Sequence, residues 1–140
     1  VTLLPPTPVP VERMAEIGSH LGDAARASAP FVMHLSGTGT FRPVSPVVFV
    51  QVAQGLSNCE LLERAVRTGP LKRSLEFPYH PHVTVAQDID EAGLDRAFSG
   101  LSDFVARFPV NNFVLFSRDA QSRWQWRTEY LLGGADNSCG

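Results

Sequence analysis

The sequence predicts a fold of the α+β class, in which strands and helices share one chain without regular alternation. Segments rich in β-branched and aromatic residues, typical of strands, are interspersed with only three segments whose apolar residues recur at the helical period. A doubly wound parallel sheet would need a helix after nearly every strand. The last two strand-like segments instead follow one another across a short polar turn, as in a hairpin.

The composition is that of an ordinary globular chain. Its 140 residues suit a single domain, which at this length buries roughly two thirds of its unfolded surface. The formal net charge of −2 argues against a broad basic surface that grips long nucleic acids, but it is compatible with a small phosphate ligand or a nucleic-acid end. Cys59 and Cys139 fit neither a zinc nor a redox spacing, so we expect a reducing, cytoplasmic location. No apolar run approaches the length of a membrane span, and we expect no membrane association.

The first third of the chain predicts three strands and one helix. Residues 1–4 alternate like a strand and lead into a rigid, proline-rich connector. Apolar residues recur every three or four positions over residues 11–27, which predicts an amphipathic helix. Residues 31–36 and 47–52 are expected to be strands, the second buried on both faces, with a turn at the glycines of residues 37–41 between them.

A second helix is expected over residues 57–68. Ser57 or Asn58 can cap its N-terminus through a side-chain oxygen. The pair Gly69-Pro70 ends it, because proline cannot continue a helix.

Three residues with reactive side chains are expected to take no part in a functional site. Cys59 falls in the first turn of the second helix and is best interpreted as a small structural cysteine. His20 lies off the apolar stripe of the first helix and is expected on the solvated surface. His34 lies on the outer face of its strand, with no partner motif beside it.

The second half of the chain opens with a strand over residues 82–87. Asp88 or Asp90 then begins a third helix. Residues 104–110 are ambiguous, because the first two can extend that helix whereas the last three suit an extended lead-in. The final hairpin is expected over residues 113–117 and 124–131.

Aromatic residues alternate along the last strand of that hairpin. Strand periodicity places Trp124, Trp126 and Tyr130 on one face. Together with neighbouring arginines, these rings have the chemistry to stack bases and hold phosphates. The simpler interpretation, which we favour, is that the aromatics cover a helix and the arginines face solvent.

The most informative stretch is residues 77–87, where two prolines and two histidines lead into a β-branched strand. Successive strand side chains point to opposite faces, so His82 and Thr84 share one face while the valines between them share the other. With the valines packed on a core, the imidazole and the hydroxyl would face a groove. They would serve there as a general acid or base and as a hydrogen-bonding group for an anionic oxygen.

The first residues of the chain show the same strand-like alternation. In Val1-Thr2-Leu3-Leu4, Thr2 takes the position that Thr84 takes in the later segment. A histidine directly before Val1 would stand to Thr2 as His82 stands to Thr84, and the sequence given begins without one.

These two segments resemble the two His-x-Thr motifs of the 2H phosphoesterase superfamily, which includes the bacterial RNA 2',5'-ligase and cyclic phosphodiesterase group. His82-Val83-Thr84-Val85, after Pro81, resembles the second motif, and residues 1–6 resemble the first motif without its histidine. Positions 2 and 84 are 82 residues apart, comparable with the separation usual in that family. Members usually carry a strand and a helix before the first motif. We therefore expect that segment and the first histidine to be missing from the sequence given, and the alternative is a protein that has lost this histidine.

The resemblance implies a bilobal fold, with two antiparallel sheets facing a central groove and helices on the outside. It implies one domain over residues 1–133, followed by a flexible tail over residues 134–140. It also implies a metal-free and cofactor-free attack on a 2',3'-cyclic phosphate or a 2'-5' linked ester. The expected partner is an RNA end or a small nucleotide with a cyclic phosphate, and the oligomeric state stays open.

The same resemblance assigns roles to individual residues. His82 would transfer a proton, and Thr84 and Thr2 would hydrogen-bond the non-bridging phosphate oxygens. Tyr79 and His80 are expected at the rim of the groove, as candidates for contact with substrate. A chain without the first histidine would be a poor catalyst.

Two other hypotheses stay open on the sequence. The same fold can serve as a non-catalytic module that binds RNA or a nucleotide. The chain can also be a structural or partner-binding domain, in which case His82 would affect no activity. No group of Asp, Glu and His residues has the spacing of a metal site, and no metal is expected.

Overall fold

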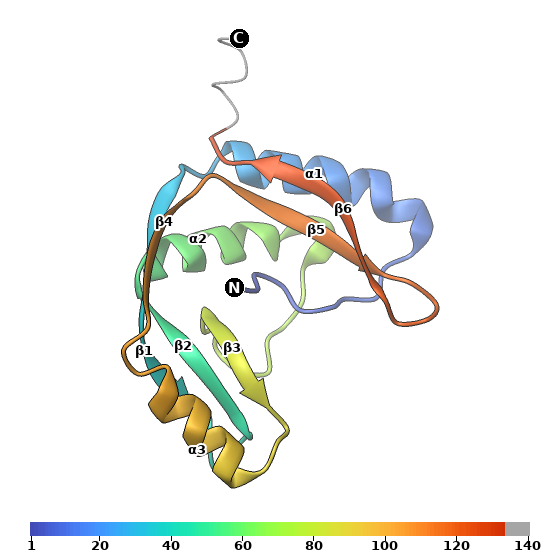
Figure 1. Ribbon diagram of the computed structural model, residues 1–140. Coiled ribbons are helices and arrows are strands. Elements are labelled where there is room, and N and C mark those ends of the chain that lie inside the picture. The colour runs from blue at the N-terminus through green and yellow to red at the C-terminus, as the bar shows by residue number, and fades with distance from the viewer. Residues whose placement is uncertain (134–140) are drawn as a thin grey trace.

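The computed structural model describes residues 1–133, which fold around two antiparallel sheets (Figure 1). The larger sheet has four strands in the order β3-β2-β1-β4, and the smaller sheet has two. The strands are β1 (Phe31–Thr40), β2 (Val47–Gln54), β3 (His82–Gln87), β4 (Val105–Val110), β5 (Asn112–Arg118) and β6 (Trp124–Leu131). The predicted α+β class is confirmed.

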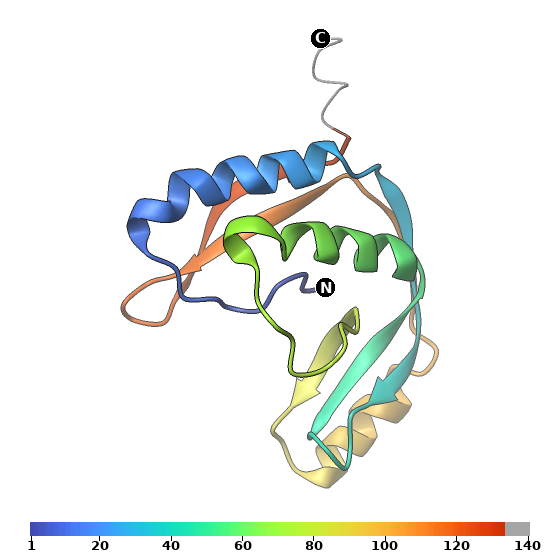
Figure 2. The ribbon, with the colours of Figure 1, turned by 180° about the vertical axis from the view of Figure 1, so that it is seen from behind.

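Three helices lie on the outside of these sheets. They are α1 (Met14–Arg26), α2 (Leu56–Val66) and α3 (Glu91–Gly100), with short 3-10 turns at Val11–Arg13 and Gly69–Leu71. Helices α1 and α2 run side by side on one face of the small sheet, whereas α3 packs on the large sheet (Figures 1 and 2). Only Asn111 separates β4 from β5, so one extended segment passes from the large sheet into the small one. The N-terminal segment lies between the two sheets (Figure 1).

The first hydrophobic core joins the helices to the small sheet. Ile17 and Leu21 of α1 are 2% and 3% exposed, and they pack with residues of α2 and of the hairpin. Burying each such side chain contributes about 1.5–3 kcal/mol. The helix expected over residues 11–27 and the hairpin are therefore confirmed. Tyr130 packs in this core as expected, but Trp124 and Trp126 are 53% and 57% exposed, so the prediction that the aromatics cover a helix is right for Tyr130 alone.

The second core lies on the large sheet. Met33 and Leu35 of β1 pack with Val50 and Val52 of β2 and with Cys59 at the start of α2. Burial raises the pKa of the Cys59 thiol, which therefore stays protonated and inert. The structural role expected for Cys59 fits this position.

The glycines of residues 37–41 do not form the expected turn. Strand β1 continues to Thr40 through an irregularity between Leu35 and Thr38, and the chain turns later, at residues 42–45. Gly37 has φ +81°, which suits this bulge. A Cβ at Gly39 would come within 2.5 Å of the Phe49 ring, so this glycine makes room for the ring.

The start of α2 also differs from the prediction. The helix begins at Leu56 after Gly55, and neither Ser57 nor Asn58 caps it, because both lie inside the first turn. Gly55 has φ +97°, and a Cβ there would lie 3.0 Å from the Val32 carbonyl oxygen. The close approach of β1 sets this boundary rather than a polar cap.

His20 is not the solvated surface residue that we expected. Its ring is half-buried, and Nε2 lies 2.9 Å from the carbonyl oxygen of Val66, the last residue of α2. The carbonyl accepts, so Nε2 donates and caps the C-terminus of α2. Periodicity placed His20 off the stripe of α1 but did not show that another helix ends there.

Of residues 104–110, all but Phe104 form a strand. All of β4 pairs with β1, with Val105 opposite Ser36, so pairing across the sheet outweighs any extension of the helix. Helix α3 begins as predicted after Asp90, whose side chain accepts a hydrogen bond of 2.8 Å from the Gly93 backbone N–H. No helix within residues 1–133 is long and apolar enough to cross a membrane. The expected tail of residues 134–140, and with it Cys139, lies outside the described residues.

Candidate active site

Strand β3 positions the second motif. It pairs antiparallel with β2, and Gln51 stands opposite His82 while Phe49 stands opposite Thr84. Pro81, directly before the strand, is buried. His82 is thus the first residue of a strand whose register is fixed by a largely buried neighbour.

Four aromatic rings surround the start of β3. Phe41 and Phe49 pack with their ring centroids 4.6 Å apart. The His82 ring lies 5.1 Å from each of them, at 89° to Phe41, and the His80 ring lies 5.4 and 5.1 Å from the same two phenyl rings. Such edge-to-face contacts restrict the rotation of a ring. We call Phe41, Phe49, His80 and His82 the ring cluster.

A hydrogen bond fixes the tautomer of His82. Its Nδ1 lies 2.6 Å from the backbone carbonyl oxygen of His80. A carbonyl oxygen only accepts, so Nδ1 carries the proton of the neutral ring and the lone pair is on Nε2. Within residues 1–133, Nε2 has no hydrogen-bond partner. His82 can therefore accept a proton from a substrate through Nε2 and later return it.

His80 is brought against His82, with the ring centroids 5.5 Å apart. Partial removal from water lowers the pKa of the His80 imidazole, although the residue as a whole is exposed, and the charge of His82 lowers it further. A neutral His80 beside His82 is therefore the state near neutral pH. His80 is exposed, and its contact with a substrate stays a prediction.

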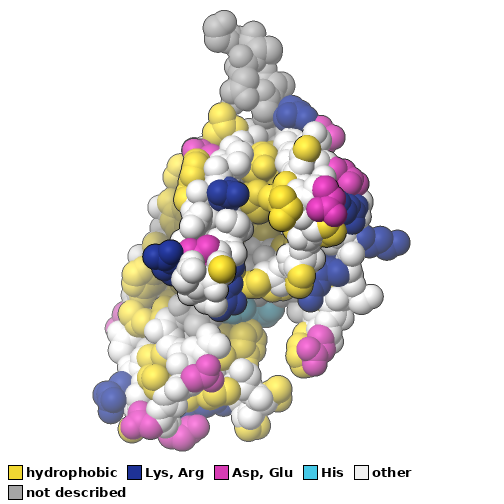
Figure 3. Space-filling view, turned by 90° about the vertical axis from the view of Figure 1, so that its right-hand side faces the viewer, with side chains coloured by type: hydrophobic (Ala, Val, Ile, Leu, Met, Phe, Trp, Pro, Cys, Tyr) yellow, Lys and Arg dark blue, Asp and Glu magenta, His cyan; other side chains and the backbone are white. Residues whose placement is uncertain are grey.

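Thr84 lies on the same strand face as His82 and is exposed. Its hydroxyl has no hydrogen-bond partner among the described residues, so it is available to a ligand. The space-filling view shows a hollow near the middle of this face of the molecule, with histidine at the back of the hollow (Figure 3).

The valines of β3 behave differently from one another. Val83 packs against the core of the large sheet, as expected. Val85 is 38% exposed, and with Leu101 and Phe104 it lines an apolar cavity of about 120 Å³ beside α3. The prediction that both valines are packed on the core is therefore only half right.

The turn after β1 supports the ring cluster, and the sequence did not reveal this. Arg42, next to Phe41, forms ion pairs of 3.0 Å with Glu91 and 2.9 Å with Asp95 on α3. These pairs hold the turn, and with it the Phe41 ring, in place. Phe49 was recognised only as part of a buried strand.

The first motif segment does not form the expected strand. Residues 1–4 have no strand pairing in the described part of the chain, and Leu3 and Leu4 both pack against core residues instead of pointing to opposite faces. A strand needs a hydrogen-bonding neighbour, and here none is present for these residues. Thr2 is exposed and, in the part of the chain that the structure describes, forms no hydrogen bond with His82 or Thr84.

Tyr79 connects this segment to the second motif. Its hydroxyl donates a hydrogen bond of 2.8 Å to the backbone carbonyl oxygen of Thr2. Burial raises the pKa of Tyr79, so the phenol stays protonated and remains a donor. The structure thus brings Thr2 next to the loop that enters β3, three residues before His82.

Within residues 1–133, no three His, Cys, Asp or Glu side chains gather in a way that could hold a metal ion.

Comparison with known protein families identifies this arrangement. A model of the 2'-5' RNA ligase superfamily matches residues 1–122. The chain belongs to this superfamily. The chain is also similar to a Bacillus mycoides protein that is provisionally named a phosphoesterase. The two are 25% identical over 139 residues, which cover 98% of this chain and 80% of the relative. The resemblance inferred from the motif residues is confirmed.

The fold of this 2'-5' RNA ligase superfamily chain is that of E. coli LigT. Crystal structures of LigT complexed with NADP+ and with 3'-AMP each match it with a TM-score of 0.63, at 20% and 19% identity. The matches cover 89% of this chain and 70% and 71% of LigT. A likeness at this identity concerns the fold, and it confirms the arrangement of two antiparallel sheets with outer helices.

Proposed function

We propose that the chain is a metal-independent phosphoesterase that acts on 2',3'-cyclic phosphates or 2'-5' linked RNA or nucleotides. The observation that carries the proposal is the geometry of His82. Its Nδ1 is held by a backbone carbonyl, and its Nε2 is free on the face that it shares with the Thr84 hydroxyl. Membership of the 2'-5' RNA ligase superfamily and the nucleotides bound to LigT support the choice of substrate.

The proposed reaction uses two imidazoles in turn. One removes a proton from water, which attacks phosphorus, while the other protonates the ribose oxygen that leaves as one P–O bond of the cyclic phosphate breaks. Each proton transfer contributes about 10²–10⁴ in rate. The Thr84 hydroxyl hydrogen-bonds a non-bridging oxygen as negative charge develops there.

The second imidazole is expected two positions before Thr2, because His82 stands two positions before Thr84. That position comes directly before Val1, so the 140-residue chain by itself is expected to turn over slowly. The natural full-length protein is therefore the enzyme to test. The hydrogen bond from Tyr79 to Thr2 supports the idea that the two motifs meet across the groove.

The test is hydrolysis of a 2',3'-cyclic nucleotide in the presence of EDTA. We expect the full-length protein to retain activity in EDTA and the His82→Ala variant to lose about 10² or more. His34→Ala is the matched control, since His34 lies on β1 outside the ring cluster and should leave turnover unchanged. Turnover that survives in His82→Ala, or that EDTA abolishes, would contradict the proposal.

A non-catalytic RNA- or nucleotide-binding role is the second candidate. It is favoured by the separation of the two motif remnants, since within residues 1–133 Thr2 forms no hydrogen bond with His82 and residues 1–4 form no strand. This candidate predicts nucleotide binding by the full-length protein without turnover. A titration with a labelled nucleotide, run beside the activity assay, separates the two.

A further inference from the structure

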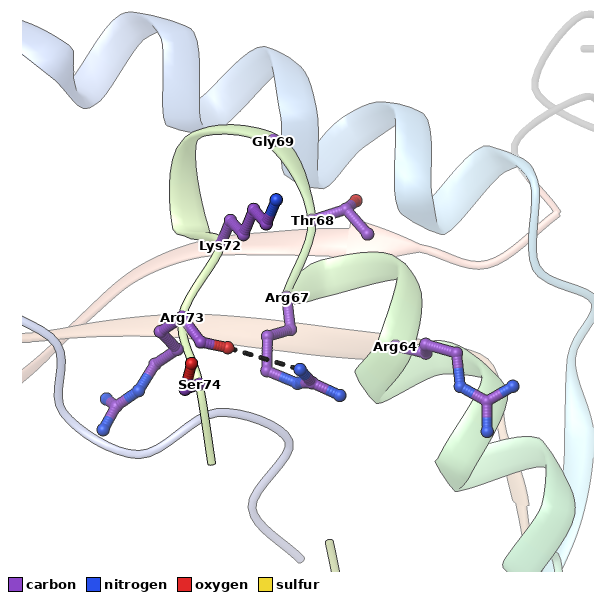
Figure 4. Close-up of a pocket in the computed structure, with 7 residues that line it drawn as sticks. All are labelled: Arg64, Arg67, Thr68, Gly69, Lys72, Arg73 and Ser74. Carbon is purple, nitrogen blue, oxygen red and sulfur yellow. Dashed lines mark hydrogen bonds between the residues drawn. The ribbon is translucent and has the colours of Figure 1, made fainter. Parts of the chain in front are cut away.

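A second hollow lies at the end of α2, away from the ring cluster. It has a volume of about 790 Å³ and is lined by seven consecutive or nearly consecutive residues (Figure 4): Arg64, Arg67, Thr68, Gly69, Lys72, Arg73 and Ser74. Four of these are cationic, and none is acidic. Four of the 12 lysines and arginines of the chain thus lie within ten positions of a protein whose formal net charge is −2.

Most of these cations are not neutralised. Within residues 1–133, neither Arg64, Lys72 nor Arg73 forms an ion pair with a carboxylate. Arg64 and Lys72 are exposed. A concentration of unpaired positive charge in a concave surface repels itself, and an anion that enters relieves this repulsion.

Two of the guanidinium groups are held in place. Arg67 pairs through Nε, at 2.5 Å, with Glu63, whose side chain is buried, and its Nη1 donates at 3.3 Å to the backbone carbonyl oxygen of Arg73. Arg73 in turn donates from Nη1 at 3.0 Å to the Thr7 hydroxyl. Groups positioned in advance lose less conformational entropy when they bind an anion.

The shape of this cationic set suits a chain of phosphates. In Figure 4 the guanidinium groups of Arg73, Arg67 and Arg64 follow one another across the pocket, and the Lys72 side chain points away from them, into the turn at Gly69. Successive phosphates along one strand can contact several of these groups, with arginine forks suited to their oxygens.

A short segment of chain leads from the pocket to the candidate active site. Ser74 is eight residues before His82, a distance that extended backbone spans in at most about 29 Å. We propose that the pocket, formed by residues 64–74, binds successive phosphates of a single-stranded RNA whose end lies at His82. The identity of the ligand as RNA rests on the proposed function, whereas the capacity to bind phosphates rests on the pocket alone.

The test is the binding of a labelled single-stranded RNA of about 12 nucleotides, by fluorescence anisotropy at several salt concentrations. The variant is Arg64→Ala with Lys72→Ala, because both side chains are exposed and neither forms a hydrogen bond among the described residues. We leave Arg67 intact, since its loss would strand the buried Glu63 carboxylate. We expect affinity at low salt to fall about tenfold or more, and the slope of log K against log salt to fall by about 1.4, or about 0.7 per phosphate contact.

The matched control is Arg26→Ala with Arg96→Ala. It removes the same charge from exposed positions on α1 and α3, outside the pocket, and should change affinity less than about twofold. Equal losses in both double variants would mean diffuse attraction and would overturn the proposal, as would no loss in the pocket variant. The pocket variant is also titrated with pyrophosphate. If it loses pyrophosphate binding but keeps its affinity for RNA, the pocket is a site for small anions and the proposal is overturned.

The same protein variants distinguish a failure of this proposal from a failure of the proposed function. Hydrolysis of a cyclic mononucleotide should be unchanged in the pocket variant, because so small a substrate does not reach both sites. His82→Ala should lose turnover and keep its RNA affinity. If the full-length protein binds RNA through the pocket but hydrolyses no cyclic phosphate, the pocket stands and the catalytic proposal fails.

Discussion

The two segments that resemble one motif are built in different ways. Around His82, the backbone is paired along β2, the side chain lies against two phenyl rings, and one ring nitrogen is tied to a carbonyl. Around Thr2, the chain has no strand partner within the described residues and is held by apolar contacts of Leu3 and Leu4 and one hydrogen bond from Tyr79. A motif therefore specifies chemistry, whereas its geometry depends on the neighbours that the fold supplies.

The largest expected effect is on stability and concerns the support of the second motif. Phe49→Ala removes a ring that is 5% exposed and leaves a cavity beneath the ring cluster. We expect the free energy of unfolding to fall by about 3–5 kcal/mol, measured by urea denaturation. Leu3→Ala, in the half-buried N-terminal segment, should cost only about 1–2 kcal/mol. Equal losses in the free energy of unfolding would show that the two segments are equally well packed.

The next effect is on catalysis and compares the two threonines. Thr84→Val in the full-length protein removes the hydroxyl and keeps the shape of the side chain. We expect kcat/KM for a cyclic nucleotide to fall about 10², because a donor to the developing charge is lost. Thr2→Val should have a similar effect if the first segment is completed as a strand in that protein.

The comparison of the threonines has a clear contrary outcome. A large loss for Thr84→Val with none for Thr2→Val would mean that Thr2 has no role in turnover. Thr38→Val is a control for the substitution itself, because the Thr38 hydroxyl is occupied by a hydrogen bond to the Phe98 carbonyl oxygen, away from the ring cluster.

Much of this architecture follows from periodicity and local chemistry. Strand period 2 places His82 and Thr84 on one face of β3, helical spacing gives α1, and Asp90 marks the start of α3. These features depend on residues close in the sequence. The prediction that His82 and Thr84 act in catalysis stays a prediction.

Features that depend on distant neighbours were missed. The sequence predicts Gly39 in a turn, whereas in the structure this glycine makes room for the Phe49 ring. The sequence predicts His20 on the surface, whereas in the structure it caps the end of α2. Residues 1–4 have the alternation of a strand, but alternation forms no strand without a paired neighbour. The cations of the pocket formed by residues 64–74 come from a helix end and a loop, so no periodic pattern in the sequence predicts that they lie together.

A smaller effect tests the single polar tie between the two regions. Tyr79→Phe removes the hydroxyl that donates to the Thr2 carbonyl oxygen and leaves the ring in the core. We expect a cost of about 0.5–1.5 kcal/mol in global stability. Limited proteolysis should show faster cleavage among residues 1–10, since local opening there becomes easier. Unchanged cleavage would mean that Leu3 and Leu4 alone hold the segment.

The smallest effect concerns His80 and the pH dependence of stability. The folded chain lowers the pKa of His80 below its ordinary value of 6.5, mainly by removing the ring from water and secondarily through the charge of His82. Between that lowered pKa and about pH 6.5 the unfolded chain therefore binds more protons than the folded one, so stability falls as the pH drops through this window. Above it, this contribution does not change.

His80→Gln should make the free energy of unfolding less dependent on pH in that window, as measured by urea denaturation at a series of pH values from neutral to mildly acidic. Added salt should flatten the wild-type profile only in part, because salt screens the charge of His82 but does not restore the water that the phenyl rings exclude. A His80→Gln profile as steep as the wild type would mean that His80 titrates alike in both states. In that case the ring cluster orients His82 without controlling the charge of its neighbour.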